Sequence, residues 1–149
     1  GIPSIAVESG LYIEGLPEEE QPAAQYRKYK GIRLSDEDCI DYYCALANQI
    51  GKQVKAMFLS AICLVVTEEN IFQSSADSLS VKPFYLAQRV HPKRVPHQPF
   101  ASLAVNLEDG RYWADDPEQI LTWELTNAHR DFLVGNTTKF WKTPYMDNI

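Results

Sequence analysis

The sequence lacks a long apolar run, and this absence excludes a membrane-spanning helix. Its longest such run, Ala56 to Val66, contains Ser60 and is about half of the roughly twenty residues that cross a bilayer. The N-terminus also lacks a basic segment followed by an apolar one, so we expect no secretory signal peptide. We therefore expect a cytoplasmic protein with no membrane partner.

Cysteine and positive charge are both scarce. Three cysteines, Cys39, Cys44 and Cys63, form no CxxC pair and lie in apolar surroundings. We expect reduced, buried thiols, and a zinc site or a nucleophilic cysteine is the less favoured alternative. The net charge of −6 lacks the basic excess of a nucleic-acid-binding protein, so no nucleic-acid partner is expected. A polyanionic small substrate would need local Lys and Arg residues or a metal ion.

The composition that is present is typical of one globular domain, residues 1–149, with 45% hydrophobic and 23% charged residues. A helix at 36–50 is indicated by Ser35 as N-cap, an acidic first turn and apolar residues at three- and four-residue steps. A strand at 54–66 is followed by a Glu-Glu-Asn turn and a return strand from Ile71. Further predicted elements are strands near 85–90 and 100–107 and a helix at 117–133. This alternation predicts an α/β fold, a mixed twisted sheet with packed helices.

The first segment, Ile5 to Ile13, predicts a strand, a turn at Gly10 and a second strand. Glu8 would then lie at a strand end, where the strand fixes the carboxylate and the turn exposes backbone N–H groups. Glu8 is therefore a candidate metal ligand or general base, and an ordinary turn is the alternative. The nearest second acid, Glu14, can join it only if the chain doubles back at Gly10.

Three further segments combine positive charge with aromatic or imidazole groups. Tyr26 to Arg33 is suited to binding phosphate, with a tyrosine that can stack on a base. His91 to His97 places two imidazoles and a Lys-Arg pair in a proline-rich loop that could line a site. His129-Arg130 can complement a helix C-terminus or contact a phosphate or a base edge. The alternative for each segment is that it has no functional role and is simply a solvent-exposed or structural part of the fold.

The order of these segments resembles the inosine triphosphatase family of nucleoside triphosphate pyrophosphatases, which act on non-standard purine nucleotides. Ile5–Leu16 is similar to the family's acidic-(Ser/Thr)-Gly-Leu segment, and Ala24–Tyr29 to its Ser-Ala-Arg-aromatic loop. Gln98–Val105 lies where the family has its substrate loop, and Asn127–Arg130 is similar to its Ser-His-Arg element. The resemblance covers about residues 5–134 in order.

This resemblance implies an inosine-triphosphatase-like fold and hydrolysis of a purine nucleoside triphosphate to monophosphate and pyrophosphate, with Mg²⁺ as cofactor. Glu8 would bind the metal or activate the water. The residues that the resemblance assigns to the substrate are Ser9, Gly10, Arg27, Lys28, Phe100, His129 and Arg130. Members of the family are usually dimers, so a homodimer is a further expectation.

Three departures from the family pattern keep a second function open. The family's N-terminal strand with its (Ser/Thr)-x-Asn-x-x-Lys phosphate-binding motif has no counterpart. Either the sequence is part of a longer protein, or it is an N-terminally shortened and diverged version of the domain. Val7 occupies the first acidic position, and proline-rich residues 95–99 replace a glycine-rich loop. The alternative function is a non-catalytic binding or interaction domain that retains the scaffold.

Overall fold

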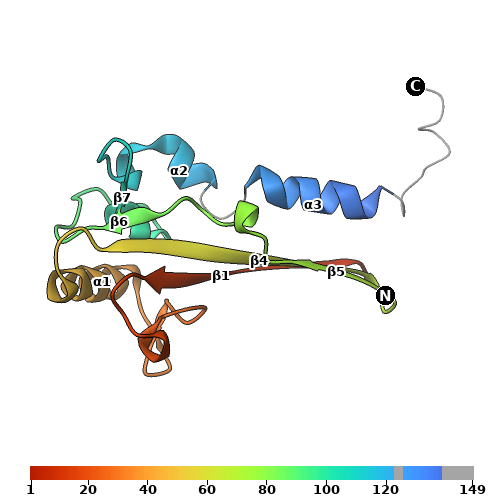
Figure 1. The fold of residues 1–149 in the computed structure, drawn as a ribbon, viewed down its shortest axis with the longest axis horizontal. Helices are drawn as coiled ribbons and strands as arrows, with labels where there is room; N and C mark the ends of the chain where they lie inside the picture. Colours follow the sequence, from red (N-terminus) through yellow and green to blue (C-terminus); the bar gives the residue numbers. More distant parts are fainter. Residues whose placement is uncertain (123–125, 139–149) are drawn as a thin grey trace.

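The computed structural model describes residues 1–122 and 126–138, which form an antiparallel sheet flanked by helices (Figure 1). In chain order the elements are β1 (Ser4–Ile13), β2 (Lys28–Tyr29), β3 (Ile32–Arg33), α1 (Asp36–Ile50), β4 (Lys55–Thr67), β5 (Asn70–Ser74), β6 (Phe84–Leu86), β7 (Ala104–Asn106), α2 (Pro117–Thr122) and α3 (Asn127–Thr137). Short 3-10 turns lie between them, of which η2 (Asp77–Leu79) and η3 (Pro99–Ser102) matter below. The predicted α/β class with helices packed against a sheet is confirmed.

β4 is the strand that organises the sheet. β1 pairs with it in antiparallel fashion along its whole length, from Ser4 opposite Val65 to Ile13 opposite Ala56. The other edge of β4 pairs with β5 at one end and with β6 at the other, and β7 continues the sheet from β6. The predicted hairpin across the Glu-Glu-Asn turn is confirmed. All pairings between the described strands are antiparallel, where the sequence predicted a mixed sheet.

α1 begins and ends where its sequence predicts. The Ser35 side chain accepts a hydrogen bond from the Asp38 backbone N–H at 3.1 Å, and the Asp38 side chain accepts one from the Ser35 backbone N–H, which forms a complete capping box. Its buried stripe is Cys39, Ile40, Tyr43 and Ala47. This stripe fixes α1 against the end of the sheet where β6 and β7 also join (Figure 1).

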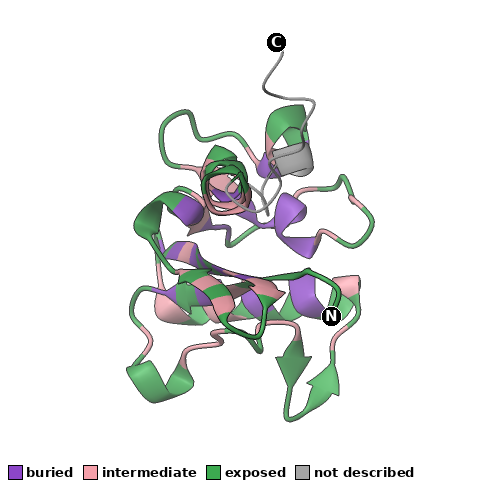
Figure 2. Ribbon diagram, turned by 90° about the vertical axis from the view of Figure 1, so that its right-hand side faces the viewer, coloured by how far each residue is buried: buried purple, intermediate pink, exposed green. Residues whose placement is uncertain are grey.

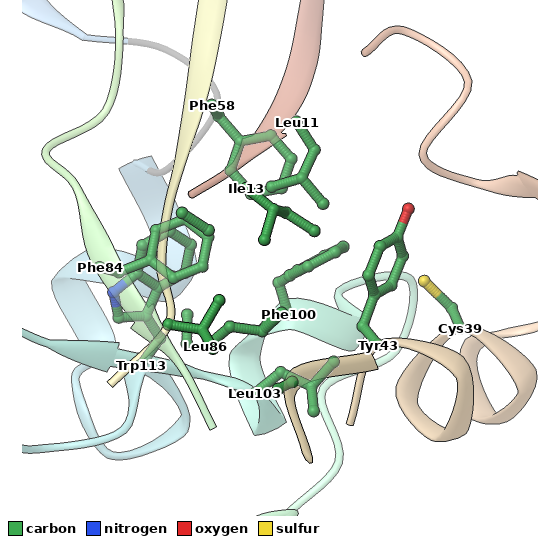
Figure 3. Close-up of a cluster of buried hydrophobic side chains, with 14 of the residues drawn as sticks. Leu11, Ile13, Cys39, Tyr43, Phe58, Phe84, Leu86, Phe100, Leu103 and Trp113 are labelled. Atoms are coloured by element: carbon green, nitrogen blue, oxygen red, sulfur yellow. The ribbon is translucent and has the colours of Figure 1, made fainter. Parts of the chain in front are cut away.

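Aromatic rings fill the core at that end of the sheet (Figure 3). Phe58 of β4 is fully buried, and its ring centroid lies 5.1 Å from Phe100 and 5.7 Å from Phe84. Tyr43 of α1 lies 5.1 Å from Phe100 on another side, and Trp113 lies 4.8 Å from Phe84. We call this region, formed by α1, β6, β7, η3 and the adjoining parts of β1 and β4, the aromatic end.

The other end of the long strand pair is more exposed. It consists of the first half of β1, the last half of β4, β5, η2 and α3, and we call it the open end (Figure 1). Ile62, Leu64 and Leu79 are buried there, but Ile5 is 57% exposed and Val7, Ile71 and Val134 are also exposed. Figure 2 views the molecule from this side, where exposed and half-buried segments predominate. α3 contacts η2.

The turn predicted at Gly10 is absent, because β1 continues through it as one strand. The backbone of Ala23 approaches here and exchanges two hydrogen bonds with Leu11, at 3.0 and 2.9 Å. A Cβ on Gly10 would lie 3.1 Å from the Ala23 carbonyl carbon, so the glycine makes room for this neighbour. Beside it, the Gln21 side-chain amide accepts from the Ile13 N–H at 2.7 Å and donates to the Ile13 carbonyl at 2.8 Å.

Two other predicted elements differ from the structure. The strand predicted at 100–107 is split into η3 and β7, since Pro99 starts a 3-10 turn. The helix predicted at 117–133 is two helices, α2 and α3, and residues 123–125 between them lie outside the described part, as does the tail from 139. Among the residues that the structure describes, no helix combines the length and apolar character that a bilayer crossing requires.

All three cysteines are free, as expected, although only Cys39 is fully buried. Burial raises the pKa of the Cys39 thiol to about 12. Such a thiol is not nucleophilic at neutral pH, which agrees with a structural role. Cys44 and Cys63 are half-buried, and burial also raises the pKa of Cys44.

Candidate functional site

Glu8 projects from the middle of β1 into a shallow groove on one face of the sheet. The groove has a volume of about 410 Å³, and we call it the Glu8 groove; its lining includes Ala6, Glu8, Ala61, Cys63, Gln73 and Ser74. Glu8 lies opposite Ala61, and Cys63 lies opposite Gln73, so the alternation of side chains places these residues on one face. Within the described residues the Glu8 carboxylate makes no hydrogen bond or ion pair, and no other acid lines the groove.

The neighbours of Glu8 point elsewhere. Ser9 lies on the opposite face of β1, where its hydroxyl is 2.7 Å from that of Ser60 in the adjacent strand. Gly10 faces Ala23, as described above. Because the strand does not double back, Glu14 remains at the far end of β1, outside the lining of the groove.

A second cavity lies at the aromatic end and is basic. It has a volume of about 130 Å³, and we call it the basic pocket; its lining includes Tyr26, Arg27, Arg33, His97, Phe100 and Trp113. Two of the segments that the sequence singled out, Tyr26 to Arg33 and His91 to His97, therefore meet in one place. The resemblance assigned Arg27 and Phe100 to the substrate, but it did not include Arg33 or His97.

Asp36 joins the two segments of the basic pocket. Its carboxylate accepts hydrogen bonds from the Arg27 Nη2 at 2.7 Å and from the His97 backbone N–H at 2.7 Å. Partial burial acts to raise the pKa of Asp36, but these two hydrogen bonds and the Arg27 charge outweigh it and lower the pKa below 3.8. The first residue of α1 thus holds a loop that lies far along the chain.

The guanidinium of Arg27 is only partly satisfied. Its Nε is buried and has no hydrogen-bond partner among the described residues. A buried donor without a partner costs about 1–3 kcal/mol. Arg33 is exposed, and its side chain makes no hydrogen bond or ion pair within the described part of the chain. His97 adopts a left-handed backbone conformation with φ 66°, which is uncommon for a residue other than glycine.

Phe100 and Lys28, which the resemblance assigned to the substrate, do not lie together in one site. Phe100 borders the basic pocket, but its ring is 3% exposed and occupies the centre of the aromatic core (Figure 3). Lys28 is exposed on β2 and does not line the pocket. Their assignment to the substrate stays a prediction.

His129 and Arg130 lie on α3, at the open end. His129 is buried, and its Nδ1 accepts a hydrogen bond from the Thr126 backbone N–H at 3.0 Å, which caps the helix. Its Nε2 is buried with no hydrogen-bond partner among the described residues, and burial lowers the pKa of the ring. Arg130 is exposed beside Asp131 at 3.2 Å. Neither residue lines the Glu8 groove or the basic pocket.

The described residues do not form a complete Mg²⁺ site by themselves. They contain no group of three or more His, Cys, Asp or Glu side chains that could hold a metal ion. Glu8 would supply one carboxylate, so waters or the phosphates of a substrate would have to complete the near-octahedral oxygen ligands of Mg²⁺. The two histidines of the 91–97 loop do not share a role either, since the Nε2 of His91 lies 3.2 Å from Asp115, while His97 lines the basic pocket.

The sequence matches no family model and no curated protein. Solved structures, however, resemble the structure of this chain closely enough to identify its fold. A HAM1 protein from Coxiella burnetii matches with a TM-score of 0.64 over 95% of this chain and 68% of its own, at 18% identity. The fold is that of the Ham1 proteins. The Staphylococcus aureus Ham1 protein matches with a TM-score of 0.59 over 93% of this chain and 66% of its own, at 20% identity.

A third solved structure carries an activity in its name. It is a nucleoside-triphosphatase, or dITP/XTP pyrophosphatase, from Mycobacterium abscessus. It matches with a TM-score of 0.57 over 96% of this chain and 67% of its own, at 18% identity. The nucleoside triphosphate pyrophosphatase-like fold that the resemblance to the inosine triphosphatase family predicted is thereby confirmed. The chain spans about two thirds of the length of each of these neighbours.

Proposed function

We propose that this protein recognises a purine nucleoside triphosphate and hydrolyses it to the monophosphate and pyrophosphate. The observation that carries the proposal is the Ham1 fold, which one solved neighbour uses as a dITP/XTP pyrophosphatase. The acidic motif of β1 supports it as well, because it leaves one unpaired carboxylate exposed in a groove. Homodimer formation is part of the same proposal.

Glu8 is the residue that would act on water in this reaction. Its side chain is exposed and has no partner within the described residues, so a water molecule can reach it. An ionised carboxylate accepts the proton of a water molecule that attacks phosphorus, which is general base catalysis. We derive no step through Mg²⁺, because the described side chains do not form a complete site for it by themselves.

A second candidate function is a binding domain without catalysis, and the isolation of Glu8 favours it. Hydrolysis of a triphosphate requires that the charge of the phosphates be offset near the reacting atoms. The described lining of the Glu8 groove holds no Lys or Arg, and Arg27 and Arg33 belong to the separate basic pocket. A chain that kept the scaffold but not this arrangement would bind nucleotide without cleaving it.

Pyrophosphate release separates the two functions. We would measure it with purified protein and MgCl₂, using inosine, xanthosine and the standard nucleoside triphosphates, and would record nucleotide binding by thermal shift in parallel. The variant is Glu8→Gln. The matched control is Glu14→Gln, which removes the same charge from the residue after β1, outside the lining of the groove.

The catalytic function predicts release that prefers a non-standard purine, falls by about 100-fold or more in Glu8→Gln and is unchanged in Glu14→Gln. Nucleotide binding without release would establish the binding domain. Absence of both binding and release would contradict the proposed function in either form. The melting temperature of Glu8→Gln without nucleotide should match that of the wild type, because the side chain makes no contact that folding depends on.

A further inference from the structure

The basic pocket is small. Cavities that bind drug-sized molecules usually measure about 300–1,000 Å³, whereas this pocket measures about 130 Å³. A tetrahedral oxyanion is a ligand of suitable size for it.

The charge of the pocket selects an anion. Two guanidinium groups, Arg27 and Arg33, and one imidazole, His97, line it, and its described lining contains no Asp or Glu. Asp36 holds the Nη2 of Arg27, whereas the exposed Arg33 side chain makes no hydrogen bond or ion pair within the described residues. The lining of the pocket thus includes a cationic side chain, Arg33, that is available to an anion.

The surroundings of the pocket would strengthen this attraction. Phe100 and Trp113 are each 3% exposed and form an apolar wall, and an apolar wall weakens the screening of charge by water. The planar fork of an arginine also matches the oxygens of a phosphate better than a lysine does. Arg27 is held in place by α1 through Asp36, so this donor is ordered before a ligand arrives.

We propose that the basic pocket binds a phosphate-type oxyanion, held by Arg27 and Arg33 with His97 beside it. The site is distinct from the Glu8 groove and does not depend on hydrolysis there. It also differs from the set of residues that the sequence resemblance assigned, because Arg33 replaces Lys28 as the partner of Arg27. A free phosphate ion and the phosphate tail of a nucleotide share this chemistry.

Inorganic phosphate is the first probe. Binding to the full chain would be measured by isothermal titration calorimetry and by thermal shift, with NaCl added to keep the ionic strength constant. The main variant is Arg33→Gln, since this exposed side chain has no contact within the described residues on which folding would depend. The matched control, Lys30→Gln, removes one positive charge from the same segment outside the pocket. Arg27→Gln is a second variant, whose folding is checked by circular dichroism.

Saturable phosphate binding that weakens about tenfold or more in Arg33→Gln and is unchanged in Lys30→Gln would support the site. Equal weakening in both variants would show a general effect of charge and would overturn the proposal. A thermal shift no larger than that of NaCl at the same ionic strength would overturn it as well. Pyrophosphate and ATP, titrated in the same way, identify the source, because the ligand that binds tightest through Arg33 is either the free ion or a nucleotide tail.

Discussion

The aromatic end and the open end share the same two long strands but bury different amounts of side chain. At the aromatic end, α1, η3, β6 and β7 enclose one continuous cluster of apolar side chains. At the open end, the same strands bury a few residues, such as Ile62 and Leu64, and leave Ile5 and Val7 exposed. One pair of strands thus connects a well-packed region to a sparsely packed one.

The two candidate sites also lie at different ends of the molecule. The basic pocket lies against the packed region, and one of its charged groups, Arg27, is held by α1 through Asp36. The Glu8 groove lies on the open end and has no charged partner for its carboxylate within the described residues. The basic pocket therefore has a cationic side chain in place before any ligand binds, whereas the Glu8 carboxylate would be fixed in position only when a ligand binds.

The largest expected effect tests whether the aromatic end carries the stability. Phe58→Ala should lower the free energy of unfolding by about 3–5 kcal/mol, because the fully buried ring contacts several others and leaves a cavity. Urea denaturation followed by circular dichroism measures it. Ile5→Ala, at the open end, should change the free energy of unfolding by less than about 0.5 kcal/mol. Similar losses in the two variants would refute the contrast between the ends.

An intermediate effect is expected at Gly10, where the Ala23 backbone crosses the edge of β1. Gly10→Ala should lower the free energy of unfolding by about 1–3 kcal/mol, since the new Cβ would lie 3.1 Å from a backbone carbon that cannot move freely. The control is Gly135→Ala in α3, where a Cβ meets nothing within 4 Å. That variant should instead raise the free energy of unfolding by about 0.5–1 kcal/mol, because alanine favours a helix. The same chemical change thus has opposite signs at the two sites.

The smallest expected effect is electrostatic and depends on pH. Asp36→Asn should cost about 1 kcal/mol at pH 7, because it removes the charge that holds Arg27 and the His97 backbone. The pKa of Asp36 is lowered below 3.8 in the folded state, so the unfolded state binds the proton first as pH falls. The stabilisation is therefore present above about pH 3.8 and is lost as pH falls through the folded-state pKa.

Denaturation of wild type and Asp36→Asn from pH 7 down to pH 3 checks this sign. The difference in unfolding free energy between the two proteins should narrow toward the acid end. A difference that stays constant over this range would show that Asp36 acts by packing rather than by its charge. The phosphate titrations described above can be repeated on this variant, which would show whether Asp36 also positions Arg27.

The elements that the sequence predicted correctly are those with local causes. The bounds of α1 follow from the capping box at Ser35 and the spacing of its apolar residues, and both lie within the helix itself. The β4–β5 hairpin follows from a long apolar run and the polar turn after it. These interactions join residues that are close in the sequence, so a sequence pattern records them.

The features that the sequence missed have causes far along the chain. Gly10 is required by the approach of Ala23 and not by a turn, and nothing near Gly10 indicates that neighbour. The basic pocket unites Arg33 with His97 because Asp36 bonds to both Arg27 and the His97 backbone. Each basic segment was visible in the sequence as a candidate, but their meeting depends on tertiary structure. The resemblance predicted the fold, and the roles of Glu8 and His129 stay predictions.

The Gln21 amide, which both donates to and accepts from the Ile13 backbone, has a consequence for solubility. It imitates a peptide group of an adjoining strand, so that, with Ala23 on Leu11, it closes the outer edge of β1 at the aromatic end. In a strand, every second residue directs its backbone N–H and C=O groups to the same edge. Ile5 and Val7 therefore direct these groups to the same outer edge as Leu11 and Ile13, but they have no partner there among the described residues. Uncovered edges with apolar side chains attract strands from other molecules. Gln21 and Ala23 together thus confine the uncovered stretch of the β1 edge to the open end.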